Sequence, residues 1–150
     1  MARYKLPESV LVVIHTPRLD VLLLERADFA GFWQSVTGSR ASIEEPLAET
    51  CAREVREETG LARAATAFDD WNYRHSYPIY PQWRHRYAPG VAHNVEHLYG
   101  LLVTERFAPR LAPREHIDYR WLPAEAAAEL CFSPSNMEAI RKLASGDIPG

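Results

Sequence analysis

Three carboxylates are concentrated in the short segment 53–58 (REVREE). In an α-helix, residues three and four positions apart lie on the same face, so Glu54, Glu57 and Glu58 would meet within about one turn. Carboxylates held this closely repel each other, and a hard divalent cation relieves the repulsion because Mg²⁺ binds carboxylate oxygens together with substrate phosphates. The pattern therefore predicts a magnesium site. The alternative is a solvated helix face balanced by pairs such as Arg53–Glu57.

A helix over residues 46–59 would carry this segment, since it contains no interior glycine or proline and Gly60 is a natural stop. Its apolar face would include Cys51, and Glu58 would lie on its polar face. Strands are expected before and after it, at 9–16, 20–26, 32–36, 67–80, 95–104 and 117–122, and further helices at 123–130 and 136–143. This order predicts an α/β (α+β) fold in which a mixed β-sheet is sandwiched between helices.

Composition restricts the classes of protein to which the chain can belong. It has 150 residues, of which 47% are hydrophobic and 25% charged, so we expect one globular domain over 1–150. The net charge of −3 disfavours binding to long nucleic acid. No apolar run is long enough for a membrane span, and Cys51 and Cys131 lack the spacing of a zinc site or a disulfide framework. We expect a cytoplasmic protein with no membrane partner.

The spacing around the acidic helix resembles a known family. Together with Gly38 and Glu45, the segment 53–61 (REVREETGL) resembles the Nudix box, GX5EX7REUXEEXGU, in which U is aliphatic. The spacing from Glu45 to Arg53 matches the box, whereas six residues instead of five separate Gly38 from Glu45. The resemblance implies a Nudix fold and Mg²⁺-dependent cleavage of a nucleoside diphosphate linked to another group, with Mn²⁺ as a possible substitute.

Three flanking stretches narrow the resemblance. Residues 33–38 (WQSVTG), 84–91 (RHRYAPGV) and 115–122 (EHIDYRWL) are similar to the Nudix branch that hydrolyses dihydroneopterin triphosphate to its monophosphate and pyrophosphate in folate biosynthesis. The alternative within the family is a hydrolase of (deoxy)nucleoside triphosphates. A non-catalytic nucleotide-binding module is a third possibility, but it predicts the loss of box carboxylates that are all present here.

The resemblance also implies roles for individual carboxylates. Glu54 and Glu58 are expected as metal ligands, and Glu57 as a third ligand or as the base that activates water, a role that Glu54 could also take. Glu115 is expected as a further metal ligand, with Glu96 as its competitor. Arg53 would orient the glutamates, and Glu45 would pair with it.

A second group of residues is expected to bind the substrate. The resemblance points to Lys5, Arg26, Thr37, Tyr77, Tyr80 and Ser133. Arg84 and Arg86 offer cationic donors to a triphosphate, or else hold their own loop to the fold. The aromatic residues between 77 and 80 would face the pocket, whereas Trp71 and Tyr73 would pack in the core.

Overall fold

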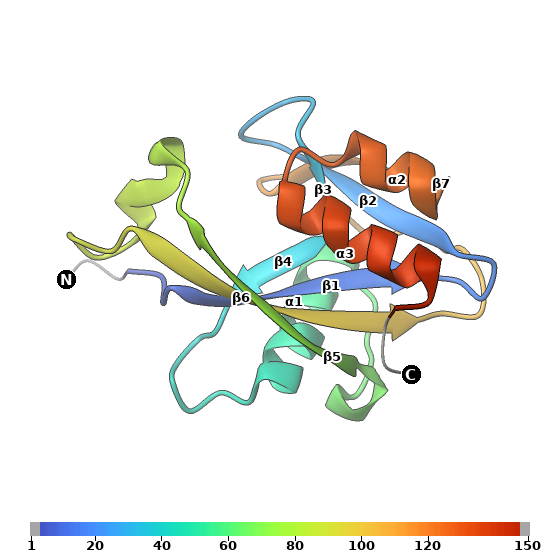
Figure 1. The fold of residues 1–150 in the computed structure, drawn as a ribbon, viewed down its shortest axis with the longest axis horizontal. Helices are drawn as coiled ribbons and strands as arrows, with labels where there is room; N and C mark the ends of the chain where they lie inside the picture. The colour runs from blue at the N-terminus through green and yellow to red at the C-terminus, as the bar shows by residue number, and fades with distance from the viewer. Residues whose placement is uncertain (1–3, 148–150) are drawn as a thin grey trace.

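The computed structural model describes residues 4–147 as a mixed β-sheet with helices on both faces (Figure 1), which confirms the predicted fold class. The strands and helices follow the chain in this order: β1 (Glu8–His15), β2 (Asp20–Arg26), β3 (Trp33–Gln34), β4 (Val36–Ser39), α1 (Leu47–Thr59), β5 (Asp69–Pro78), β6 (His93–Leu102), β7 (His116–Pro123), α2 (Ala124–Leu130) and α3 (Pro134–Ser145). Two short 3₁₀ helices, Ala65–Ala67 and Pro81–Arg86, lie before and after β5. Within these residues no helix is long and apolar enough to cross a membrane.

The central strand β1 divides the sheet into two parts. It runs parallel to β6 along its whole length and antiparallel to β4 over residues 9–12. It pairs with β2 only where His15 faces Val21, near the hairpin. Because β4 occupies the edge of β1 beyond that point, the ribbon of β2, β3 and β7 separates from β1, β4, β5 and β6. The divergence opens the space in which the site is built.

Each face of the sheet has its own apolar core. Helix α1 packs on one face through Cys51, Ala52 and Val55, against side chains of β1 that include Val10. Helices α2 and α3 cover the other face, where Ile140 lies among side chains such as Leu11 (Figure 1). Side chains of β1 alternate between these two covered faces, which explains why the strand is buried from Ser9 to Ile14. The expectation that Cys51 faces the core is confirmed.

The single strand expected at 32–36 is wrong, because the chain changes partners within it. Ser35 separates β3 from β4, and its backbone N–H donates to Asn136 Oδ1 at 2.8 Å while its hydroxyl accepts from Asn136 Nδ2 at 3.0 Å. This side-chain clamp from α3 satisfies the backbone group that the ladder leaves free. Thr37 and Gly38, which follow the expected strand, lie inside β4.

Candidate active site

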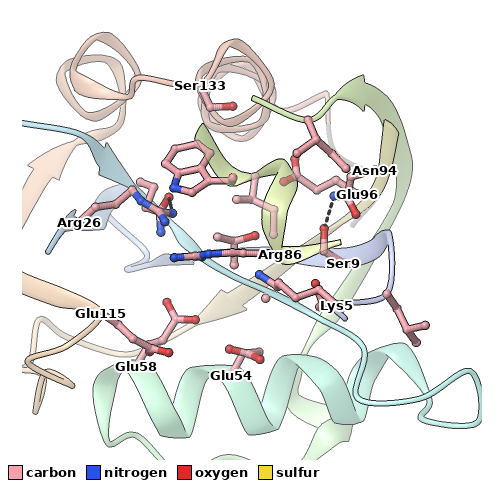
Figure 2. A pocket seen from close by; sticks show the side chains of 18 of the residues that line it. Lys5, Ser9, Arg26, Glu54, Glu58, Arg86, Asn94, Glu96, Glu115 and Ser133 are labelled. Atoms are coloured by element: carbon pink, nitrogen blue, oxygen red, sulfur yellow. Dashed lines mark hydrogen bonds between the residues drawn. The ribbon is translucent and has the colours of Figure 1, made fainter. Parts of the chain in front are cut away.

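A cavity of about 680 Å³ lies where β1 and β2 diverge. Its walls come from the N-terminal end of β1, the end of β2, β4, the polar face of α1, β6 and the start of α3. It brings together most of the residues expected from the sequence: Lys5, Arg26, Thr37, Arg53, Glu54, Glu57, Glu58, Tyr77, Tyr80, Arg86, Glu115 and Ser133. Segments that are far apart in the sequence thus meet around one space (Figure 2).

Helix α1 presents its carboxylates to the floor of this cavity. Although Glu58 lies on the polar face of α1, it is only 2% exposed, because the chain around Glu115 and His116 covers that end of the helix. Burial and the negative charges of Glu54 and Glu115 raise the pKa of Glu58 well above its ordinary value. Burial also raises the pKa of Glu54. Glu57, by contrast, keeps half of its side chain exposed.

These carboxylates fit a divalent cation. Within residues 4–147, Glu58 Oε1 is buried and has no hydrogen-bond donor, and the negative charge of Glu54 is close enough to oppose its ionisation. Acidic oxygens that are crowded, desolvated and short of donors form a donor set suited to Mg²⁺. The charge of Glu115 acts on Glu58 as well, whereas Glu96 lies across the cavity (Figure 2). This arrangement favours Glu115 over Glu96 as the further ligand.

Arg53 is held on the helix by a two-pronged ion pair. Its Nε donates to Glu45 Oε2 and its Nη2 to Glu45 Oε1, both at 3.0 Å, and its Nη1 donates to Glu54 Oε1 at 2.7 Å. The guanidinium of Arg53 lowers the pKa of Glu45 to about 2. Arg40 donates to the carbonyl oxygen of Glu45 through Nε and Nη2 at 3.0 and 2.7 Å. The loop between Gly38 and Glu45, which is one residue longer than in the Nudix box, is therefore tied to helix α1 through Glu45.

Cationic side chains lie across the cavity from α1. Figure 2 shows Lys5 and Arg86 between the carboxylates of the helix and the residues of β6, with Arg26 on the opposite side of the cavity from β6. Arg26 is fixed by Asp28, which accepts from its Nε and Nη2 at 2.8 Å each, and by the Trp83 ring, 4.2 Å from its guanidinium carbon. These hydrogen bonds lower the pKa of Asp28 to about 2. Positive groups held in this way can bind a polyphosphate.

Two of the expected substrate residues are placed differently from the others. Arg84 does not line the cavity: it borders a separate, shallower depression, and its Nε donates to the Ile79 carbonyl at 3.3 Å. It therefore holds its own loop, the second of the two roles considered for it. Thr37 lines the cavity, but its hydroxyl already donates to the Val10 carbonyl at 2.9 Å.

An aromatic wall closes one side of the cavity. Tyr80, Trp83 and Phe132 have ring centroids 5.4 to 5.9 Å apart, and all three line the cavity. Flat apolar faces of this kind can stack on a heterocyclic ring. Trp71 is only 2% exposed in the core beneath α3, as expected. Tyr73, in contrast, is at the surface, where the Lys142 amine lies 4.3 Å from its ring centroid.

Sequence reasoning missed a chain of polar contacts that ends at Glu58. Arg26 Nη1 donates to Gln34 Oε1 at 3.1 Å, and Gln34 Nε2 lies 3.1 Å from His116 Nε2. With the amide oriented by Arg26, its nitrogen is the donor, so His116 carries its proton on Nδ1. That atom lies 3.8 Å from Glu58 Oε1. The only available signal was the position of His116 next to Glu115.

Comparisons with known proteins agree with this geometry. The family model described as NUDIX domain matches residues 5–143. A dihydroneopterin triphosphate diphosphatase of Haemophilus influenzae is 42% identical over 145 residues, covering 95% of this chain and 90% of the relative. The enzyme of the same name from Escherichia coli K12 is 41% identical over 144 residues, covering 93% of each. The structure of the E. coli dihydroneopterin triphosphate pyrophosphohydrolase superposes with a TM-score of 0.88 at 38% identity, covering 95% of this chain and 98% of that one.

Proposed function

Because the chain belongs to the NUDIX family, whose domain spans residues 5–143, we propose that it is a metal-dependent diphosphatase that hydrolyses dihydroneopterin triphosphate to dihydroneopterin monophosphate and pyrophosphate. The curated relatives that are 41–42% identical carry this activity in their names. One observation in the cavity supports the proposal most directly. Buried carboxylates of α1 face three cationic side chains, and an aromatic wall borders the same space.

The carboxylates would hold the cation. Glu54 and Glu58 are the proposed main ligands, with Glu115 and Glu57 completing the set. When bound, Mg²⁺, or Mn²⁺ in its place, neutralises charge on the phosphate oxygens and on the leaving group. Arg53, anchored by Glu45, keeps Glu54 in position.

The remaining residues would bind the substrate and activate water. Lys5, Arg26 and Arg86 offer charged donors to the triphosphate, which would hold it close to the carboxylates of α1. Glu57 is the proposed base, because its half-exposed carboxylate can reach water and the one ion pair that it makes within residues 4–147, to Arg53 at 3.6 Å, is long. Ser133, Tyr77 and Tyr80 border the end of the cavity away from the acidic helix and would contact the pterin.

Steady-state hydrolysis with Mg²⁺ tests this function. We expect a higher kcat/KM for dihydroneopterin triphosphate than for each of a panel of nucleoside triphosphates, with pyrophosphate as the product and no turnover in EDTA. A preference for a nucleotide would support the proposed metal-dependent hydrolysis but would contradict dihydroneopterin triphosphate as the substrate. Absence of pyrophosphate release from every substrate would contradict the assignment as a hydrolase.

A further inference from the structure

The end of the cavity away from α1 contains a group of buried polar side chains that hydrolysis does not require. Asn94 and Glu96 lie two residues apart on β6, and Ser9 lies beside them on β1. Their exposed fractions are 1%, 4% and 5%. We call these three residues the inner pocket. Figure 2 shows Asn94 and Glu96 on the far side of the cationic residues from Glu54 and Glu58.

The inner pocket has more hydrogen-bond acceptors than donors. Within residues 4–147, the one hydrogen bond found for Glu96 is from Ser135 Oγ to its Oε1, at 3.1 Å, and no cationic side chain pairs with it. Asn94 uses its amide nitrogen to donate to Ser9 Oγ at 2.7 Å and to the Tyr77 hydroxyl at 3.1 Å. Its Oδ1 is left buried and without a donor in the described chain. Buried acceptors in this condition are costly, so the pocket is suited to a ligand that supplies several donors.

The pterin ring has several hydrogen-bond donors along one of its edges. Its amino-pyrimidinone part carries a ring N–H beside an exocyclic amine, which gives two parallel donors at the spacing of the two oxygens of a carboxylate. The same fork-to-carboxylate match makes arginine–carboxylate pairs bidentate. Guanine has an equivalent edge. Adenine, cytosine and uracil lack it, because each of them presents an acceptor or a single donor at the corresponding atoms.

We propose that Glu96 is a specificity-determining residue that recognises the amino-pyrimidinone edge of the substrate, with Asn94 Oδ1 accepting the second proton of the exocyclic amine. This inference rests on the proposed function. The order of groups along the cavity supports it, since metal-binding carboxylates, phosphate-binding cations and the inner pocket follow one another as the triphosphate and the pterin do in the substrate. The aromatic side chains Tyr80 and Phe132 line the same cavity and supply the face on which the ring can stack.

Burial of Glu96 disfavours the charged form of its carboxylate. Its surroundings raise its pKa to about 7 in the free protein. Donors from the ligand would restore the interactions that the carboxylate lost on leaving water. Ser135, in the first turn of α3, orients the carboxylate without neutralising it, and its own hydroxyl lies 3.0 Å from that of Ser133.

The substitution Glu96→Gln tests the proposal, because it keeps the size of the side chain and replaces an acceptor oxygen with a donor amide. We expect kcat/KM for dihydroneopterin triphosphate to fall about 100-fold, chiefly through KM, and kcat/KM for GTP to fall in parallel. The value for ATP should stay within about twofold of the wild type, because adenine cannot use the carboxylate. Glu129→Gln, an exposed change on α2, is the matched control and should affect none of the three substrates.

A second measurement is independent of metal and phosphate. Calorimetric titration with 7,8-dihydroneopterin in EDTA should detect binding to the wild type and to Glu129→Gln, and a loss of at least about tenfold in affinity for Glu96→Gln. An equal loss of activity on ATP, or unchanged pterin binding, would overturn the assignment of Glu96. If the wild type fails to hydrolyse dihydroneopterin triphosphate, the proposed function fails separately, and Glu96 would then be judged by the ratio of GTP to ATP hydrolysis.

Discussion

Gly38 of β4 lies directly against the carboxyl group of Glu54, and a Cβ at this glycine would overlap the carboxyl carbon and both oxygens. The backbone of a strand therefore sets the position of a proposed metal ligand on a helix. Gly38 has an ordinary β backbone conformation, so the backbone does not itself require glycine at this position. A glycine is required because any side chain would collide with the Glu54 carboxyl group.

Gly38→Ala should displace the Glu54 carboxylate while leaving the two cores intact. We expect kcat/KM with Mg²⁺ to fall about 100-fold, because a displacement of about 1 Å is enough for a loss of this size. Steady-state kinetics and thermal unfolding measure the two effects. Gly146→Ala is the control: its φ of +78° makes alanine unfavourable, but it ends α3 far from the cavity, so it should lower stability and leave kcat/KM unchanged. Normal activity of Gly38→Ala would contradict the placement of Glu54 as a ligand.

Glu58→Gln should have opposite effects on stability and activity: the metal-free protein should become more stable, and turnover should be lost. The substitution removes an ionisable group whose charged form is disfavoured by burial and by the charges of Glu54 and Glu115, so we expect the metal-free protein to become more stable at neutral pH. Turnover should be lost, because the amide is a poor ligand for Mg²⁺. Urea denaturation in EDTA and hydrolysis with Mg²⁺ measure the two effects. Near-normal activity of this variant would show that the metal assignment is wrong.

Arg53→Lys should loosen the helix from the loop that carries Glu45. Lysine cannot reproduce the two parallel hydrogen bonds to Glu45 together with the contact to Glu54. We expect a loss of about 1–3 kcal/mol in the free energy of unfolding, together with a fall in kcat. Arg56→Lys, an exposed change on the same helix, should have neither effect. Equal behaviour of the two variants in denaturation and kinetics would contradict the orienting role of Arg53.

The stability difference between Glu96→Gln and the wild type should depend on pH. Because the pKa of Glu96 is about 7 in the folded state against an ordinary 4.5, its stabilising contribution is complete below about 4.5 and is lost as pH rises through about 7. The variant should therefore be more stable than the wild type by about 1–3 kcal/mol near pH 8, and similar to it near pH 4. Urea denaturation of the metal-free proteins measures this difference. His75 and Tyr77, which face this region from β5, are common to both proteins. A difference that is the same at both pH values would contradict the burial of a titrating Glu96.

Gln34→Glu should change the tautomer of His116. A carboxylate at position 34 can only accept from Nε2, whereas the wild-type amide donates to it. Burial and the charge of Arg26 hold the pKa of His116 near 4, so the wild-type ring is neutral at pH 7. Long-range ¹⁵N–¹H spectra should show the proton on Nδ1 in the wild type and on Nε2 in the variant. The Nε2–H tautomer in the wild type would contradict the polar chain that ends at Glu58.

The sequence by itself determined the local parts of the site. The expected helix at 46–59 agrees with α1, and Gly60 ends it in the left-handed conformation. The pairing of Glu45 with Arg53, which the resemblance to the Nudix box implied, is also local, because both residues belong to one short loop and helix whose geometry depends on near neighbours. The resemblance to the Nudix family rested first on the same segment, and the family model matches the chain over residues 5–143.

Only the tertiary structure decided how the elements meet. The burial of Glu58 depends on the chain around His116, and the exclusion of Arg84 depends on a carbonyl of its own loop. The inner pocket exists because β1 and β6 run side by side and bring Ser9 next to Asn94 and Glu96. Helical periodicity places side chains within one element, but burial and pKa depend on what other elements pack against that face, and this is set by the register and divergence of strands far apart in the chain.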